Sequence, residues 1–88
     1  MQKAYHDYKK ITRKYDRIIK EKELTLKEKR REFDQEVRGL EDVPDRDQIS
    51  RITKMVNDMH SLEEDIMKFR GYRLRDWKRW LEDLRERR

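Results

Sequence analysis

The sequence predicts an all-α protein, a long antiparallel helical hairpin of the coiled-coil type. A heptad series runs through the first half of the chain. It comprises Tyr5, Thr12, Ile19, Leu26, Phe33 and Leu40. The only proline, Pro44, follows this series, and a second apolar series begins after it. Glycine occurs only twice and 51% of the residues are charged, so long, polar, uninterrupted helices are favoured.

The first helix is predicted to span about residues 3–38, and residues 39–45 form the predicted turn. Arg38 would place a positive charge in the last turn of this helix. Gly39 follows it, at the position where many helices end with a glycine in the left-handed conformation. The heptad series therefore ends where the chain is predicted to reverse.

The second helix is predicted to span about residues 46–86, so that residues 1–88 form a single domain. Asp45 and Gln48 have the spacing of a capping box at its start. Gly71 is a weak point, since glycine costs about 1 kcal/mol relative to alanine within a helix, and a break there would create a third helix. Continuity is favoured because a spacing of three or four residues crosses this point at Phe69, Arg73, Trp77, Trp80 and Leu84.

A register in which each residue i opposes residue 87 − i matches the lengths of the two helices. This register places three pairs of opposite charges face to face: Lys22 with Asp65, Lys29 with Asp58, and Glu36 with Arg51. Exposed ion pairs contribute only about 0–1 kcal/mol each, so their expected role is to align the helices.

The apolar surface of the second helix spans about 160°, which is wider than a two-helix seam requires. Part of it would stay exposed in an isolated hairpin. We therefore expect two hairpins to form a homodimeric four-helix bundle, or one hairpin to dock on a helix of another protein. The residues predicted to pack in the hairpin or its oligomer interface are Ile11, Ile18, Ile19, Leu26, Phe33, Ile52, Met55, Met59, Leu62, Ile66 and Phe69.

The open end of the hairpin is predicted to be basic and aromatic. Residues 1–20 carry a formal charge of +5, residues 70–88 carry +4, and residues 21–69 carry −4. Most of the aromatic residues lie in the two basic segments, where they either close the mouth of the hairpin or form a partner surface. The predicted partner surface consists of Tyr5, Tyr8, Tyr15, Tyr72, Arg73, Trp77, Trp80, Leu81 and Leu84.

Two other kinds of partner fit the same end less well. Phosphates could bind Arg70, Arg73, Arg75, Lys78 and Arg79 while aromatic rings stack on bases. Acidic residues are interspersed among these cations, however, and no zinc-finger, RNP or homeodomain signature is present. Residues 72–88 also form an amphipathic segment that could lie on a membrane surface, which is the least favoured partner.

The sequence offers no catalytic, cofactor or metal site. The chain has no cysteine, and its two histidines, His6 and His60, lie on different predicted helices. His60 and Glu64 are too few ligands for a metal ion. No apolar run approaches the roughly 18 residues of a membrane span. We therefore predict a non-enzymatic oligomerisation or protein-docking module, a scaffold in a larger assembly or in a longer parent chain. We expect it to be intracellular, in the cytoplasm or nucleus.

Overall fold

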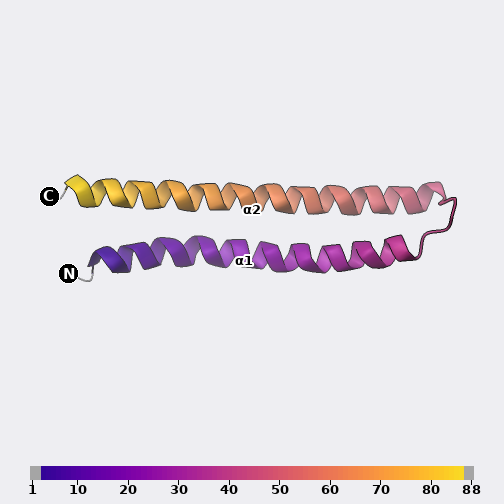
Figure 1. The fold of residues 1–88 in the computed structure, drawn as a ribbon, viewed down its shortest axis with the longest axis horizontal. Helices are drawn as coiled ribbons and strands as arrows, with labels where there is room; N and C mark the ends of the chain where they lie inside the picture. The colour runs from indigo at the N-terminus through magenta and orange to yellow at the C-terminus, as the bar shows by residue number, and fades with distance from the viewer. Residues whose placement is uncertain (1–2, 87–88) are drawn as a thin grey trace.

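The computed structural model of the chain describes residues 3–86 and shows a helical hairpin. Helix α1 spans Lys3–Arg38 and helix α2 spans Arg46–Glu86, with no strand among these described residues. The helices run antiparallel, so that the two termini lie at one end and the turn at the other (Figure 1). The predicted all-α hairpin is confirmed. Residues 1–2 and 87–88, which belong to the predicted single domain, lie outside the described residues.

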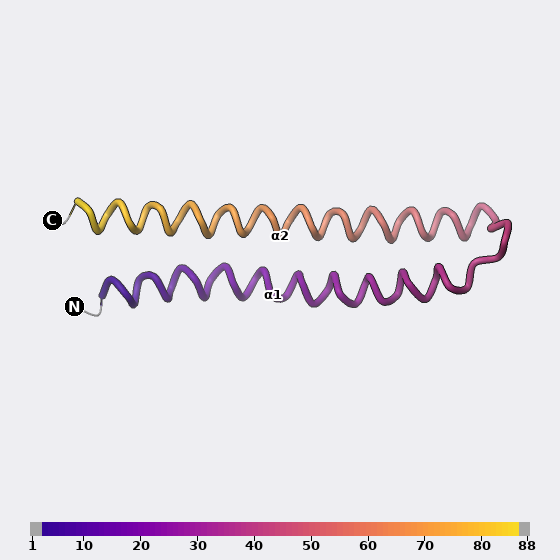
Figure 2. Tube along the Cα trace, viewed as in Figure 1, coloured from indigo at the N-terminus to yellow at the C-terminus, as the bar shows by residue number. Residues whose placement is uncertain are grey.

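The hairpin is a thin rod rather than a globule. Its extents are 67 × 17 × 13 Å and its Cα radius of gyration is 19.9 Å. A compact chain of this length would have a radius of gyration of about 12 Å. The two helices lie side by side along almost their whole length (Figure 2). Because each helix has only one neighbour, only one face of each can be covered within the hairpin.

Helix α2 begins with the predicted capping box. The backbone N–H of Gln48 donates to Asp45 Oδ1 at 2.8 Å, and the backbone N–H of Asp45 donates to Gln48 Oε1 at 3.1 Å. Each side chain therefore satisfies a backbone donor that the first helical turn leaves without a partner. The helix then continues without a break through Gly71, where an added Cβ would meet nothing within 4 Å.

Helix α1 ends at Arg38, but not in the predicted glycine conformation. No glycine has a positive φ in the part of the chain that the structure describes. The N–H of Gly39 still donates to the carbonyl of Gln35 at 3.2 Å, and the N–H of Leu40 donates to the carbonyl of Val37 at 3.2 Å. The helix therefore ends by tightening its last turn, which satisfies these carbonyls without a left-handed residue.

The two helices enclose a small core. Only Tyr15, Ile19 and Ile66 are buried, at 5–6% exposure, among the described residues. Tyr15 is predicted to lie on the partner surface, but it belongs to this core instead. The residues packed against the core are Ile11, Leu26, Phe69 and Tyr72. The other residues predicted to pack are half-buried: Ile18, Phe33, Ile52, Met55, Met59 and Leu62.

The register follows the predicted rule at two of the three charged pairs. Lys22 Nζ lies 3.5 Å from Asp65 Oδ2, and Arg51 Nε lies 2.9 Å from Glu36 Oε1. Within residues 3–86 no ion pair joins Lys29 to Asp58. Two pairs that are far apart along the rod nevertheless obey one rule, so the helices have the predicted alignment.

Candidate functional site

The aromatic residues of the open end pack across the seam between the helices. The ring of Tyr8 lies 5.9 Å from that of Trp77 and 5.4 Å from that of Trp80, measured between centroids. Trp77 Nε1 donates to Thr12 Oγ1 at 3.1 Å, and Trp80 Nε1 donates to the carbonyl of Ala4 at 3.0 Å. Both indoles are half-buried with satisfied N–H groups, and they fill the mouth of the hairpin between the two helices.

Tyr5 lies at the edge of this cluster and is more available to a partner. Its side chain is 57% exposed, while its ring lies 6.2 Å from that of Tyr8. Leu84 is half-buried, whereas Leu81 is 49% exposed. Tyr72 packs edge-on against Phe69 with a centroid distance of 5.7 Å. The structure thus divides the predicted partner surface, bringing most of its aromatic rings into the seam and leaving Tyr5 and Leu81 outside.

Tyr15 and Asp76 form the most buried polar contact between the helices. The Tyr15 hydroxyl donates to Asp76 Oδ2 at 2.6 Å. This hydrogen bond, together with burial, raises the pKa of the Tyr15 hydroxyl above its ordinary value. The same hydrogen bond and the nearby Arg75 lower the pKa of Asp76, although partial burial opposes them. The pair thus favours a protonated tyrosine facing an ionised carboxylate.

Most of the arginines predicted to contact nucleic acid already have acidic partners. Arg70 Nη2 lies 2.7 Å from Glu23 Oε1, Arg73 pairs with Asp16, and Arg75 Nε lies 3.3 Å from Asp76 Oδ1. Within residues 3–86, only Lys78 and Arg79 of the predicted set form no ion pair. A phosphate would have to compete with these carboxylates at three of the five positions, and the nucleic-acid interface stays a prediction.

Two of the same arginines also stack on aromatic rings. The Arg73 guanidinium lies 4.9 Å from the ring centroid of Trp77, and that of Arg75 lies 5.0 Å from the ring centroid of Tyr72. Arg73, which is predicted to belong to the partner surface, is therefore held in place by Asp16 and Trp77. Its Nε is buried and has no hydrogen-bond partner among the described residues.

An exposed apolar stripe runs along α2 beside the seam, and it is the surface that the hairpin leaves without a partner. Five large side chains form it, with spacings of 7, 11, 7 and 7 residues. At about 100° per residue, these spacings place all five within about 40° of one another around the helix. The α2 stripe consists of Ile49, Val56, Met67, Leu74 and Leu81, which are 45–71% exposed.

The predicted partner surface contains Leu81 together with Trp77 and Trp80, and Leu74 lies seven residues before Leu81 on the same helix. In the structure this surface is divided, because the tryptophans point into the seam while the two leucines are about half exposed. The heptad pattern of α1 does not show which part of the wide α2 surface α1 covers. The repeated seven-residue spacing in α2 is the signal that could have identified the stripe.

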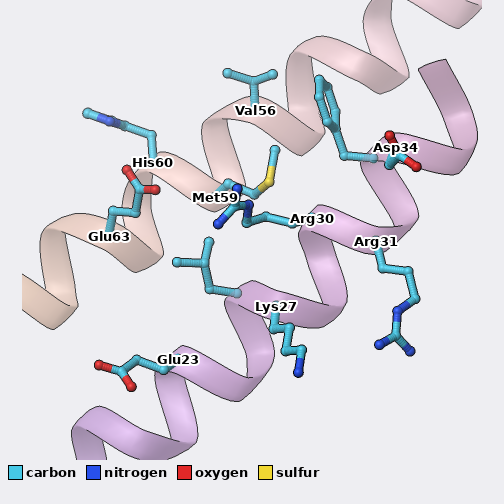
Figure 3. A pocket seen from close by; sticks show the side chains of 11 residues that line it. Glu23, Lys27, Arg30, Arg31, Asp34, Val56, Met59, His60 and Glu63 are labelled. Atoms are coloured by element: carbon cyan, nitrogen blue, oxygen red, sulfur yellow. The ribbon is translucent and has the colours of Figure 1, made fainter.

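A groove of about 1060 Å³ between the helices adjoins the α2 stripe near the turn. Val56 belongs to both, while Met59 and the α1 residues Leu26 and Phe33 add further apolar lining. In Figure 3, Met59 lies toward α1 beside Arg30, and Val56 points away from α1. The groove also has acidic and basic walls, including Glu63 and Lys27. The apolar surface therefore extends from the stripe into the hairpin on one side of the rod.

Within the described part of the chain, the structure shows no metal-binding group of side chains at this surface. No group of three or more His, Cys, Asp or Glu side chains in residues 3–86 could hold a metal ion. His60 contacts Glu64 at 2.8 Å, and both side chains are about two-thirds exposed.

Neither described helix has a segment long and apolar enough to cross a membrane. Comparison of the chain with protein families, curated proteins and solved structures finds no match.

Proposed function

We propose that this chain is a non-enzymatic protein-association module, and that its α2 stripe mediates the packing of two hairpins into a coiled-coil four-helix bundle. The observation that carries the proposal is the contrast between five aligned, exposed apolar side chains and only three buried ones among residues 3–86. Contiguous exposed apolar surface commonly marks a protein interface.

The stability of the hairpin gives a second argument. Most of the stability of a helix in a protein comes from tertiary packing of its apolar face. Here α1 and α2 contain 36 and 41 residues, yet each packs against a single neighbour. A second hairpin on the stripe side would cover the stripe and the adjoining groove, which is how four-helix bundles bury the faces of long helices.

The area available suggests an association of moderate strength. Burying an apolar side chain fully is worth about 1.5–3 kcal/mol, so covering five half-exposed ones contributes roughly 5 kcal/mol per chain. Two chains would gain roughly 10 kcal/mol, against an association cost of about 4–15 kcal/mol. The groove residues must therefore add to the gain, and the oligomer should dissociate on dilution.

Light scattering across a concentration range tests this proposal. We expect a mass of twice the 11.2 kDa chain at high concentration, decreasing on dilution. Leu74 lies between Met67 and Leu81 in the stripe. Replacing Leu74 with lysine should shift the equilibrium to monomer. A charge there would have to be buried without a partner in the dimer.

A matched control is available on α1. Leu24 is 55% exposed, close to the 52% of Leu74, but it lies on the other helix and outside the stripe. Leu24→Lys should leave the mass unchanged. A single-chain mass at every concentration would contradict self-association and favour docking on a different protein. Equal effects of Leu24→Lys and Leu74→Lys would contradict the assignment of the interface to the stripe.

A further inference from the structure

The α2 stripe has a symmetry of its own, centred near Asp65. Ile49 and Leu81 each lie 16 residues from this centre, and Val56 and Leu74 each lie 9 residues from it. A helix that packs against an antiparallel copy of itself brings together residues at equal distances on either side of a two-fold axis. Four of the five stripe residues therefore face one another when one copy is reversed, while the position opposite Met67 is Glu63.

We propose, on the basis of the self-association proposed above, that α2 packs antiparallel against α2 of a second copy, with a two-fold axis at the level of Asp65. Ile49 then faces Leu81 of the second copy, and Val56 faces Leu74 of the second copy. Met67, the most exposed of the five at 71%, lies two residues from the axis. Measured along the direction of the helices, the two Met67 positions are thus about 6 Å apart, within reach of two flexible side chains.

Apolar matching alone does not select this orientation, because a parallel dimer would also align the stripe with its own copy. Charge does select it. Residues 46–65 of α2 contain three basic and five acidic side chains, whereas residues 66–86 contain seven basic and four acidic ones. The basic half of α2 also lies beside the basic start of α1. A parallel dimer would bring two strongly basic ends together, while an antiparallel dimer brings each basic end against the acidic turn end.

Individual charges that border the stripe point the same way. At about 100° per residue, Glu63 lies at one edge of the stripe, at the angle of Leu81, and Arg70 lies about 20° beyond it. Arg46 and Glu82 lie on the other flank. In the antiparallel dimer Glu63 comes within one turn of Arg70 of the second copy, and Arg46 comes within one turn of Glu82 of the second copy. In the parallel dimer each flank would instead face the opposite flank of the second copy, so neither of these pairs would form.

The Glu63 contact would extend an ion pair that already exists. Arg70 binds Glu23 across the seam at 2.7 Å, and its guanidinium has further N–H donors. Glu63 of the second copy would therefore share Arg70 with Glu23, linking α1 and α2 of one hairpin to α2 of the other.

Disulfide trapping tests the orientation directly, because the chain contains no cysteine. Val56→Cys and Leu74→Cys are made as separate variants, unfolded and refolded together, and oxidised gently. Positions 56 and 74 are about 27 Å apart along the helix, far beyond the reach of a disulfide. The antiparallel dimer therefore predicts that a disulfide between the two variants is the dominant product, identified by its intact mass. It also predicts no cross-link when either variant is oxidised alone.

Self-linked products from each variant alone would overturn the antiparallel arrangement. So would the absence of any cross-link at a concentration where light scattering shows a dimer, because α2 would then not face α2. Both results would leave self-association intact, whereas a single-chain mass for the unmodified protein would contradict the proposed function itself. Leu24→Cys, an equally exposed position off the stripe, provides the background level of random cross-linking.

Discussion

The two halves of the rod are held together differently. In the open half, Tyr15, Ile19 and Ile66 are buried, and the indoles of Trp77 and Trp80 make hydrogen bonds across the seam. In the half beside the turn, no described side chain is buried. An ion pair between Glu36 and Arg51 crosses the seam there, and the capping box stabilises the start of α2.

This difference explains how a single hairpin can be both aligned and incomplete. The open half provides enough specific contacts to set the register of the helices. The turn half contains the groove and two of the five stripe residues, and none of its described side chains is buried, so it is the less completely packed half. In the antiparallel dimer proposed above, the well-packed half of one copy would cover the loosely packed half of the other.

The largest expected effect comes from truncating the core of the open half. Ile66→Ala should lower the free energy of unfolding by about 2–3 kcal/mol, because Ile66 is 5% exposed and its truncation removes buried apolar contacts and leaves a cavity. Ile52→Ala in the turn half should cost only about 1 kcal/mol, because Ile52 is half-buried. Urea unfolding at a concentration where the chain is monomeric measures both.

Protein concentration must be matched between the variants, because association adds to the apparent stability. Equal losses for Ile66→Ala and Ile52→Ala in the monomer would contradict the difference between the halves. An Ile52→Ala loss that grows with concentration would instead indicate that the turn half is covered in the dimer.

A smaller and pH-dependent effect is expected at the Tyr15–Asp76 hydrogen bond. Tyr15→Phe removes the donor and should destabilise the hairpin by less than Ile66→Ala. The pKa of Asp76 is lowered in the folded chain, so its contribution is present above its ordinary pKa of 3.8 and is lost as the pH falls through the folded value. The pKa of Tyr15 is raised, so its contribution is present below 10.0 and is lost as the pH rises through the folded value.

The difference in urea midpoint between the unmodified chain and Tyr15→Phe should therefore be constant between about pH 5 and pH 9, and narrow on either side. Tyr5→Phe is the control, since the Tyr5 hydroxyl has no hydrogen-bond partner among the described residues and its side chain is 57% exposed. A difference that stays constant to pH 3 would mean that Asp76 does not accept this bond in solution.

The sequence predicts the hairpin well because its features are local or periodic. Pro44 and the Asp45–Gln48 spacing locate the start of α2, and the heptad series identifies the face of α1 that meets α2. The burial of Tyr15 is harder to predict, because it depends on Asp76 lying one turn beyond the residue that the register places opposite.

The candidate surface could be predicted only in outline. The wide apolar surface of α2 indicates that some of it stays exposed, but α1 decides which part. Trp77 and Trp80 face the seam because their N–H groups reach Thr12 and Ala4, and Leu74 on the adjoining face is left outside. Which part of α2 is covered by α1 depends on the shape and hydrogen bonding of particular side chains. A pattern of apolar residues in the sequence does not reveal these properties.

The smallest expected effect lies in the charged pairs that align the two helices. Exchanging the charges of Lys22 and Asp65 should first cost up to about 1 kcal/mol in each single variant and then recover in the double variant, because the pair spans the seam at 3.5 Å. The same cycle at Lys29 and Asp58, which form no ion pair within residues 3–86, should show no coupling. Double-mutant cycles in urea at low salt measure both. Equal coupling at the two sites would mean that the two helices pack as closely at Lys29 and Asp58 as at Lys22 and Asp65. The exposed apolar surface near the turn would then result from the residues present there and not from looser packing of the helices.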